Sequence, residues 1–203
     1  MPHEHQFYRT VLKGMFSLDL ASAGTFTYRS KAGYLNLDEV RVERAERNGL
    51  EHLKEKKAYR LPMSERVRRV ATLLRGMATI SGGAKLALHY TDVTPVVVVA
   101  AVIKGGNNPF QYLITADERG LPRVDEEAFR ETIKVWGDQL LSKLYAGWCK
   151  GFHDGQRKAL ANILKDVLGG DGSNGYLLSH PREALEALAA DIEKDGADLG
   201  WME

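Results

Sequence analysis

The stretch Val96-Val97-Val98-Val99-Ala100-Ala101-Val102-Ile103 decides the fold, because it is the longest apolar run in the chain. A continuous β-branched run of this length is typical of a central strand that is buried on both faces of a sheet. Gly105, Gly106 and Pro109 follow at once and indicate a turn. Residues 110–115 are therefore predicted to form the hairpin partner of this strand.

Helices are predicted on both sides of this hairpin. Residues 64–80 carry apolar side chains at helical spacing, with Ser64 placed to cap the first turn. Asp125 and the two glutamates after it open a second helix, since acidic groups suit the positive N-terminal end. Two further helices are predicted, one at residues 156–168 and one that begins at Pro181, where proline fits the first turn.

Two more strands complete the predicted core, at residues 7–21 and 144–149. The order strand, helix, strand, strand, helix, strand is that of an α+β, ferredoxin-like (RRM-like) βαββαβ fold. We therefore expect a single RRM-like domain over residues 1–203. It has a long insertion after strand one, at about residues 23–62, and a C-terminal helical extension at about residues 153–203.

The predicted insertion has its own composition. Its first part is rich in glycine, aromatic and basic residues, and residues 38–60 are dense in charge and poor in apolar side chains. We interpret it as a surface excursion that contains one short helix near residues 49–56.

Charge is distributed unevenly along a chain whose net charge is only +1. Residues 1–108 hold 17 basic and 10 acidic side chains, whereas residues 109–203 hold 11 basic and 17 acidic ones. The first part therefore carries +7 and the second −6. Such asymmetry favours a basic face for a polyanion, although a chance segregation of solvated charges gives the same counts.

Several classes of protein are disfavoured by the sequence. No apolar run approaches the ~20 residues of a membrane helix, and the N-terminus lacks the apolar core of a secretory signal, so we expect no membrane and a cytoplasmic location. The single Cys149 excludes an internal disulfide framework and a multi-cysteine zinc site, and we expect this residue to be buried as a small hydrophobe. Phosphate-binding glycine motifs and histidines at metal-ligand spacing are also missing, so no cofactor and no metal site is expected.

Catalytic residues are not evident either. His89 and Asp92 could act as a general base and its orienting carboxylate, but no nucleophile accompanies them. We expect Asp92 instead to accept local backbone hydrogen bonds in a turn. The sequence therefore predicts a protein without catalytic residues.

Basic residues interleaved with glycine and aromatic residues form three candidate RNA-binding clusters. Lysine, arginine and main-chain amides hold phosphates, while aromatic and guanidinium planes stack on bases. Ordinary surface charge is the alternative for any single cluster. Three clusters in one part of the chain favour binding of nucleic acid. The predicted RNA-binding residues are Tyr28, Arg29 and Lys31 in the first cluster, Lys54, Lys56 and Lys57 in the second, and Gly82, Gly83 and Lys85 in the third.

Three segments resemble a known family. They are the motif at residues 80–95, Ile-Ser-Gly-Gly-Ala-Lys-Leu-Ala-Leu-His-Tyr-Thr-Asp-Val-Thr-Pro, the Lys-Gly-Gly-Asn-Asn-Pro-Phe at residues 104–110, and the Ser-His-Pro-Arg-Glu-Ala-Leu at residues 179–185. Together they are similar to the DevR/Csa-two-type backbone subunits of CRISPR type I surveillance (Cascade) complexes.

This resemblance implies an RRM-like palm, several copies of which coat a CRISPR guide RNA (crRNA) in a helical filament. It also implies that the spacer is presented for pairing with target DNA, and that the other partners are further Cascade subunits. The loop at residues 29–31 and the turn at residues 82–85 are the guide contacts that the resemblance favours. The protruding thumb of the family has no clear counterpart, and residues 38–60 are the one segment long enough for it.

Two alternatives stay open at this stage. One is a metal-independent endoribonuclease that processes CRISPR transcripts with His89 or His52. The other is a protein–protein adaptor in which the charge asymmetry serves only head-to-tail assembly. RNA affinity that depends on salt, without cleavage, separates the backbone subunit from both.

Overall fold

A computed structural model describes residues 11–29, 35–82, 92–169 and 175–203 of the chain. It contains helices and small sheets, which confirms the predicted α+β class. The chain forms two compact units. Unit 1 comprises Met1–Ser17 and Pro95–Ala184, and unit 2 comprises Leu18–Thr94 and Leu185–Glu203.

The sheet of unit 1 has three strands in the order β4-β7-β8, namely Val97–Ala100, Leu144–Trp148 and Tyr176–Ser179. Strand β4 runs antiparallel to β7, and β8 runs parallel to it. All five residues of β7 are buried, as the two flanking strands require. The prediction that β4 is the central strand is wrong, because β7 is its one strand partner in the described chain and its first three valines are half-buried.

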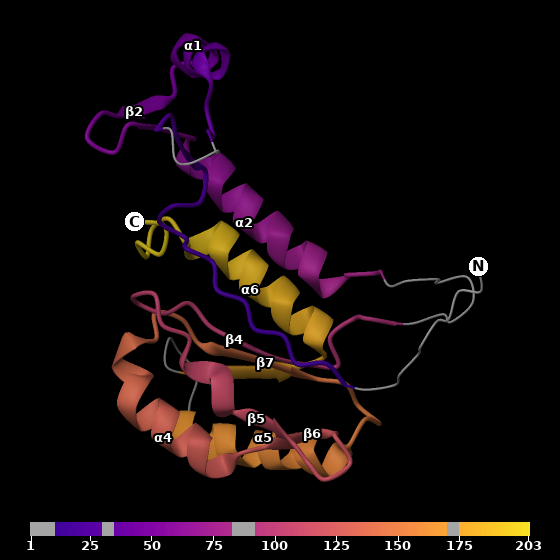
Figure 1. Cartoon of the computed structure of the whole chain (residues 1–203). Coiled ribbons are helices and arrows are strands. Elements are labelled where there is room, and N and C mark those ends of the chain that lie inside the picture. Colours follow the sequence, from indigo (N-terminus) through magenta and orange to yellow (C-terminus); the bar gives the residue numbers. More distant parts are fainter. Residues whose placement is uncertain (1–10, 30–34, 83–91, 170–174) are drawn as a thin grey trace, which may run out of the picture. The chain divides into compact units, whose positions relative to one another are not determined.

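Helices α4 (Glu126–Trp136) and α5 (Asp154–Leu168) pack side by side and cover this sheet (Figure 1). Both agree with the predicted helices, and the Oδ1 of Asp125 caps α4 by accepting from the amide of Ala128 at 3.0 Å. A short helix η2 (Gly137–Gln139) follows α4. The core of unit 1 consists of apolar side chains from the strands, both helices and the loops between them: Leu113, Val124, Phe129, Leu144, Ala146, Trp148, Leu160, Ile163 and Leu164.

The predicted hairpin after β4 is wrong. The proline turn leads into a short helix η1 (Pro109–Tyr112), and strand β5 (Ile114–Ala116) pairs with β6 (Pro122–Val124) instead of β4. Asn108 explains the change, since its Oδ1 accepts from the amide of Phe110 at 3.1 Å and caps η1. The apolar run after the turn thus begins as a helical turn and not as an extended strand.

The predicted first strand at residues 7–21 is wrong over its described part. Residues 11–19 form no strand, and the first strand in the described chain is β1 (Thr25–Thr27). Side-chain hydrogen bonds attach this segment to the rest of unit 1 in place of a backbone ladder. Lys13 donates to the carbonyl of Ile114 at 2.9 Å, and Asn108 donates to the carbonyl of Phe16 at 3.3 Å. Its apolar side chains stay largely exposed, so burial does not stabilise a strand there.

Unit 2 contains a sheet in the order β1-β3-β2, with β2 at Glu51–Leu53 and β3 at Ala58–Arg60. Helix α1 (Glu39–Arg47) precedes the β2–β3 hairpin. The predicted short helix near residues 49–56 is therefore wrong. Asp38 starts α1 earlier by capping the amide of Arg41 at 2.9 Å, and residues 51–60 form antiparallel strands.

Two long helices complete unit 2. Helix α2 (Met63–Ala78) confirms the predicted helix, but its N-cap is Pro62, so the predicted capping role of Ser64 is wrong. Helix α6 (Pro181–Asp195) begins at the proline that predicts it, and from Leu185 onward it belongs to unit 2. Arg75 of α2 donates to Glu193 of α6 at 2.7 Å. No described helix has the length and apolar character that a bilayer crossing requires.

Candidate nucleic-acid interface

Four exposed cations come together at the turn of the β2–β3 hairpin. Lys54, Lys56 and Lys57 lie in the turn at residues 54–57, where Lys57 adopts a left-handed backbone with φ of 49°. The carbonyl of Lys57 accepts from the amide of Tyr28 at 3.0 Å, which places the exposed Arg29 next to this turn. These four residues are called the cationic hairpin below. Glu55 is the single acidic residue of the turn at residues 54–57.

None of the four cations forms an ion pair with another residue that the structure describes. Charged groups of this kind remain hydrated and available for phosphates. The hairpin therefore provides positive charge that no described carboxylate neutralises through direct pairing.

Three aromatic rings lie on the sheet beside the cationic hairpin. His52 of β2 stacks on Tyr59 of β3 with ring centroids 4.5 Å apart and planes inclined by 12°. Tyr28 contacts both rings at 5.9 Å, and its hydroxyl is 3.0 Å from the Nε2 of His52. Register explains the arrangement, because His52 and Tyr59 are directly opposite across the strands and share one face. These three residues form the aromatic cluster.

Tyr59 fixes this cluster to helix α1. Its hydroxyl donates to the Oε1 of Glu46 at 2.6 Å, and the side chain is only 3% exposed. The hydrogen bond to the Glu46 carboxylate, assisted by burial, raises the pKa of Tyr59 to about 12. Tyr59 is therefore a neutral, buried support, whereas His52 and Arg29 face solvent.

An ion pair connects the two strands at the other end of the hairpin. The Nε and Nη2 of Arg60 each donate to one carboxylate oxygen of Glu51 at 2.8 Å, in the bidentate geometry that orients both groups. The hydrogen bond from Arg60 holds the pKa of Glu51 below its ordinary value. Arg60 is therefore paired with Glu51 across the two strands. The cations of the turn form no ion pair with a described residue and can bind a ligand.

Arg66 connects the base of this sheet to the end of the chain, and the sequence analysis did not single it out. It is 2% exposed, and its guanidinium donates to the carbonyl of Ala23 at 2.8 Å and of Met202 at 2.6 Å. Two more carbonyls, those of Leu20 and Ala21, accept at 3.3 and 2.9 Å. Burial lowers the pKa of this guanidinium. The sequence feature that could have identified Arg66 is its position four residues before Val70, which places it on the apolar face of α2.

The structure brings together five of the nine predicted RNA-binding residues: Tyr28, Arg29, Lys54, Lys56 and Lys57. Lys31, Gly83 and Lys85 lie outside the described residues. Gly82 follows the far end of α2, whose 16 residues correspond to about 24 Å. Gly82 is therefore not part of the surface formed by the hairpin and the rings.

The predicted turn role of Asp92 is confirmed. Its Oδ1 accepts from the amide of Thr94 at 2.8 Å and from the hydroxyl of the same residue at 2.6 Å. These hydrogen bonds hold the pKa of Asp92 below its ordinary value. His89 lies outside the described residues. Within the described ranges, no three histidine, cysteine, aspartate or glutamate side chains gather in a metal-binding arrangement.

The prediction that Cys149 is buried is wrong. It is half-exposed just after β7, and its Sγ lies 3.3 Å from the Nε2 of His180. The neighbouring Trp148 takes the core position, with a side chain that is 0% exposed. Both faces of β7 are buried, and Cys149 lies one residue beyond the end of this strand, where the buried run stops.

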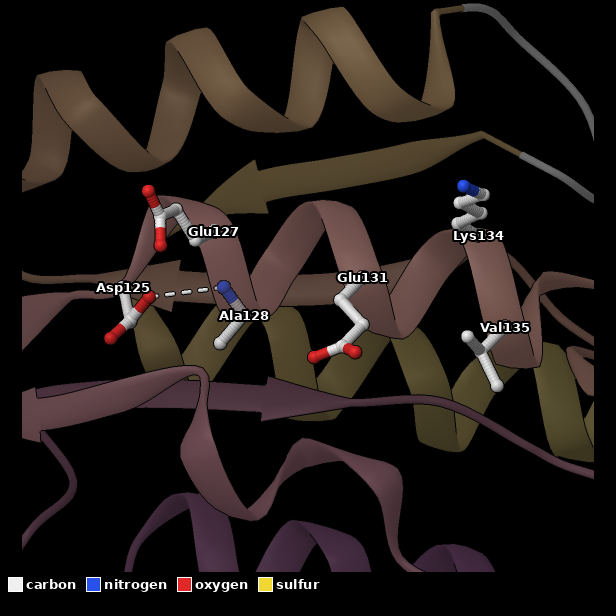
Figure 2. A pocket seen from close by; sticks show the side chains of 6 residues that line it. All are labelled: Asp125, Glu127, Ala128, Glu131, Lys134 and Val135. Carbon is white, nitrogen blue, oxygen red and sulfur yellow. Dashed lines mark hydrogen bonds between the residues drawn. The ribbon is translucent and has the colours of Figure 1, made fainter.

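An acidic depression lies on the outer side of α4 in unit 1 (Figure 2). Glu127 and Glu131 line it with Asp125, and Lys134 is the single cation among its lining residues. The carboxylate of Asp125 already caps the helix. This surface can attract a cationic group, but its shape does not enclose a small molecule.

No protein-family model, curated protein or solved structure matches this chain.

Proposed function

We propose that this chain is a non-catalytic guide-RNA-binding backbone subunit of a type I CRISPR surveillance complex, which coats the spacer of the crRNA for pairing with target DNA. The observation that carries the proposal is the cationic hairpin beside the aromatic cluster. The proposal names this family because the sequence motifs at residues 80–95, 104–110 and 179–185 resemble it.

The chemistry of the interface fits a single-stranded RNA. Ammonium groups of Lys54, Lys56 and Lys57 attract phosphates whatever the base sequence, as a coat on variable spacers requires. His52 presents an exposed ring that Tyr59 supports from behind, and such a plane accepts any base by stacking. A surface that combines these two features binds a strand without selecting its sequence.

The proposal includes an RRM-like palm and repetition of the subunit. A chain of this size covers only part of a guide, so copies repeat along it through a heterologous contact. The acidic side of α4, with Glu126, Glu127 and Glu131, is the surface we assign to the basic part of a neighbouring copy. Because exposed ion pairs contribute only ~0–1 kcal/mol each, the RNA supplies most of the organising force.

Purification from cells that also express a CRISPR array tests the central claim. We expect a raised ratio of absorbance at 260 nm to that at 280 nm, and sequencing should return guide RNA with varied spacers. RNA of unrelated sequence, or none, would contradict the proposal. Guide RNA that is cut by the purified protein, with cutting abolished in His52→Ala or His89→Ala, would favour the endoribonuclease.

Light scattering on RNAs of graded length tests the assembly. We expect monomers or small oligomers without RNA, and particles whose mass rises stepwise as the RNA lengthens. A mass that stays at one or two copies for every length would leave a solitary RNA-binding domain. Assembly that is equally extensive without RNA would favour the protein–protein adaptor.

A further inference from the structure

A cysteine–histidine pair lies in unit 1, among residues that the proposed RNA contact does not use. Cys149 follows β7 directly, and His180 follows β8 directly. The two strands are parallel neighbours, with Gly147 opposite Ser179, so both residues emerge at the same edge of the sheet. Their side chains meet there, with the Sγ of Cys149 at 3.3 Å from the Nε2 of His180.

The backbone holds both members of the pair. The amide of Cys149 donates to the carbonyl of Val96 at 3.0 Å, which extends the pairing with β4 by one residue. The amide of His180 donates to the Oε2 of Glu183 at 3.1 Å, and its carbonyl accepts from the amide of Ala184 at 2.9 Å. The distance between sulfur and imidazole is therefore set by the sheet and by the first turn of α6.

Hydrogen bonding also determines which imidazole nitrogen carries the proton. The amide of Arg182 donates to the Nδ1 of His180 at 3.2 Å, so Nδ1 is an acceptor and bears no hydrogen. In the neutral ring the proton is then on Nε2, directed at the sulfur of Cys149. His180 in this form is a hydrogen-bond donor to sulfur and not a base that removes its proton. A donor at this place stabilises the thiolate more than the thiol.

The charges around the sulfur act in both directions. The N-terminus of the 15-residue helix α6 begins beside His180, and Lys150 and Arg182 are exposed cations next to the pair in the sequence. Positive groups and helix N-termini favour a thiolate. Glu183 opposes them, although its carboxylate is shared with the amide of His180. Partial exposure of Cys149 gives a small reagent access to the sulfur.

We propose that Cys149 is a modification site, a thiol that His180 activates for exchange with low-molecular-weight disulfides. In this step the thiol loses its proton to solvent, and the thiolate attacks one sulfur of the disulfide. A new S–S bond forms to Cys149 while the original S–S bond breaks. The departing thiolate then takes up a proton, so one disulfide is consumed and one small thiol is released.

The rate of reaction with the small disulfide 4,4′-dithiodipyridine tests the proposal, because Cys149 is the only cysteine in the chain. At pH 7 an ordinary thiol is only a few per cent thiolate, so we expect the native protein to react about fivefold to tenfold faster than the same protein unfolded in denaturant. A native rate equal to or below the unfolded rate would overturn the proposal.

Two variants of His180 separate activation from mere exposure. His180→Ala removes the donor, and the native rate should fall to that of the unfolded protein, whereas His180→Gln retains an N–H donor and should keep part of the acceleration. Lys158→Ala, at an exposed position of α5 in unit 1, is the control and should react like the wild type. Far-UV circular dichroism identifies a variant that does not fold, in which case the wild-type comparison and the glutamine variant decide. Full acceleration in a folded His180→Ala protein would refute the role of His180.

Discussion

The two three-stranded sheets of this protein are held together by different kinds of interaction. In the β4-β7-β8 sheet of unit 1, all five residues of β7 are buried and the apolar faces of α4 and α5 cover the strands. In the β1-β3-β2 sheet of unit 2, β3 buries Ala58 and Tyr59, and polar contacts supply the rest. These contacts are Tyr59 with Glu46, Arg60 with Glu51, and Arg66 with backbone carbonyls.

This difference explains where a ligand can bind. A sheet that is stabilised by apolar burial has few groups left to offer a polyanion. A sheet that is stabilised by hydrogen bonds at its base can present charge at its turn, as the cationic hairpin does. Substitutions inside the unit 1 sheet should therefore reduce stability. In unit 2, substitutions at the base of the sheet should also reduce stability, whereas those in its turn should mainly reduce binding.

The largest effect is expected from Gly147→Ala in β7. An added Cβ would lie 2.4 Å from the Cα of Pro181 and 2.8 Å from its nitrogen, and neither backbone atom can rotate away. Overpacking of this kind costs about 3 kcal/mol, or more where backbone must shift. Urea denaturation should show the loss in the free energy of unfolding.

Gly155→Ala in α5 is the matched control, because an added Cβ there meets no atom within 4 Å. It should leave stability unchanged or raise it by about 0.5–1 kcal/mol, since alanine favours a helix over glycine. If Gly147→Ala behaved like this control, the close contact between β7 and the start of α6 would be refuted.

The second largest effect is expected from Arg66→Met in unit 2. Methionine keeps the apolar stem but removes the donors to the carbonyls of Leu20, Ala21, Ala23 and Met202. A buried acceptor left without a partner costs about 1–3 kcal/mol. Met202 is buried, whereas Leu20, Ala21 and Ala23 are at least partly exposed and their carbonyls can be rehydrated, so we expect a loss of about 2–3 kcal/mol in total. Limited proteolysis should also reveal earlier cleavage near the C-terminus.

Arg68→Met is the control for Arg66→Met. Arg68 pairs with Glu65 on the exposed side of the same helix, and such surface pairs contribute about 0–1 kcal/mol. Equal losses of stability in the two variants would show that the carbonyl contacts of Arg66 do not carry the effect.

The same difference between the sheets determines what the sequence could predict. Helices α2, α4, α5 and α6 were predictable, because each has apolar residues at helical spacing, and Asp125 and Pro181 also mark the starts of α4 and α6. Strand β7 was predictable for its apolar run. The first strand and the hairpin after β4 were not, because an apolar run predicts burial and leaves the pairing partner undetermined.

The candidate interface was predictable in its charges and not in its geometry. Lys54, Lys56 and Lys57 were selected as a cluster because they are close in sequence. Their junction with Tyr28 depends on the β1–β3 pairing, and the stacking of His52 on Tyr59 depends on the register of β2 with β3. Strands of three residues are too short for an alternation pattern to reveal this register.

A smaller effect, confined to binding, is expected from the triple variant Lys54→Ala, Lys56→Ala, Lys57→Ala. If three phosphate contacts are lost, affinity for single-stranded RNA should fall about tenfold or more at moderate salt, and the slope of log K against log salt should shrink by about 2. The loss should be similar for unrelated sequences, because phosphates carry no base information. Fluorescence anisotropy at several salt concentrations measures both quantities.

The control for this triple variant removes three exposed lysines of unit 1, Lys134, Lys158 and Lys165, to alanine. Net charge then changes equally, so a general electrostatic effect would weaken binding in both variants to the same extent. Equal slopes of log K against log salt in the two variants would show that the hairpin is not part of the RNA interface.

The smallest effect is expected at alkaline pH from Tyr59→Phe, which removes the hydroxyl that donates to Glu46. The pKa of Tyr59 is raised from 10.0 to about 12, so the neutral hydroxyl stabilises the folded state fully below pH 10, and this contribution is lost as the pH rises towards 12. The wild type should therefore be modestly more stable than Tyr59→Phe at pH 8, and the two should converge between pH 10 and 12. Denaturation at graded pH measures the difference, in which the titration of lysines common to both proteins cancels. A difference that stayed constant from pH 8 to 12 would show that Tyr59 does not hold α1 to the small sheet through an ionisable hydrogen bond.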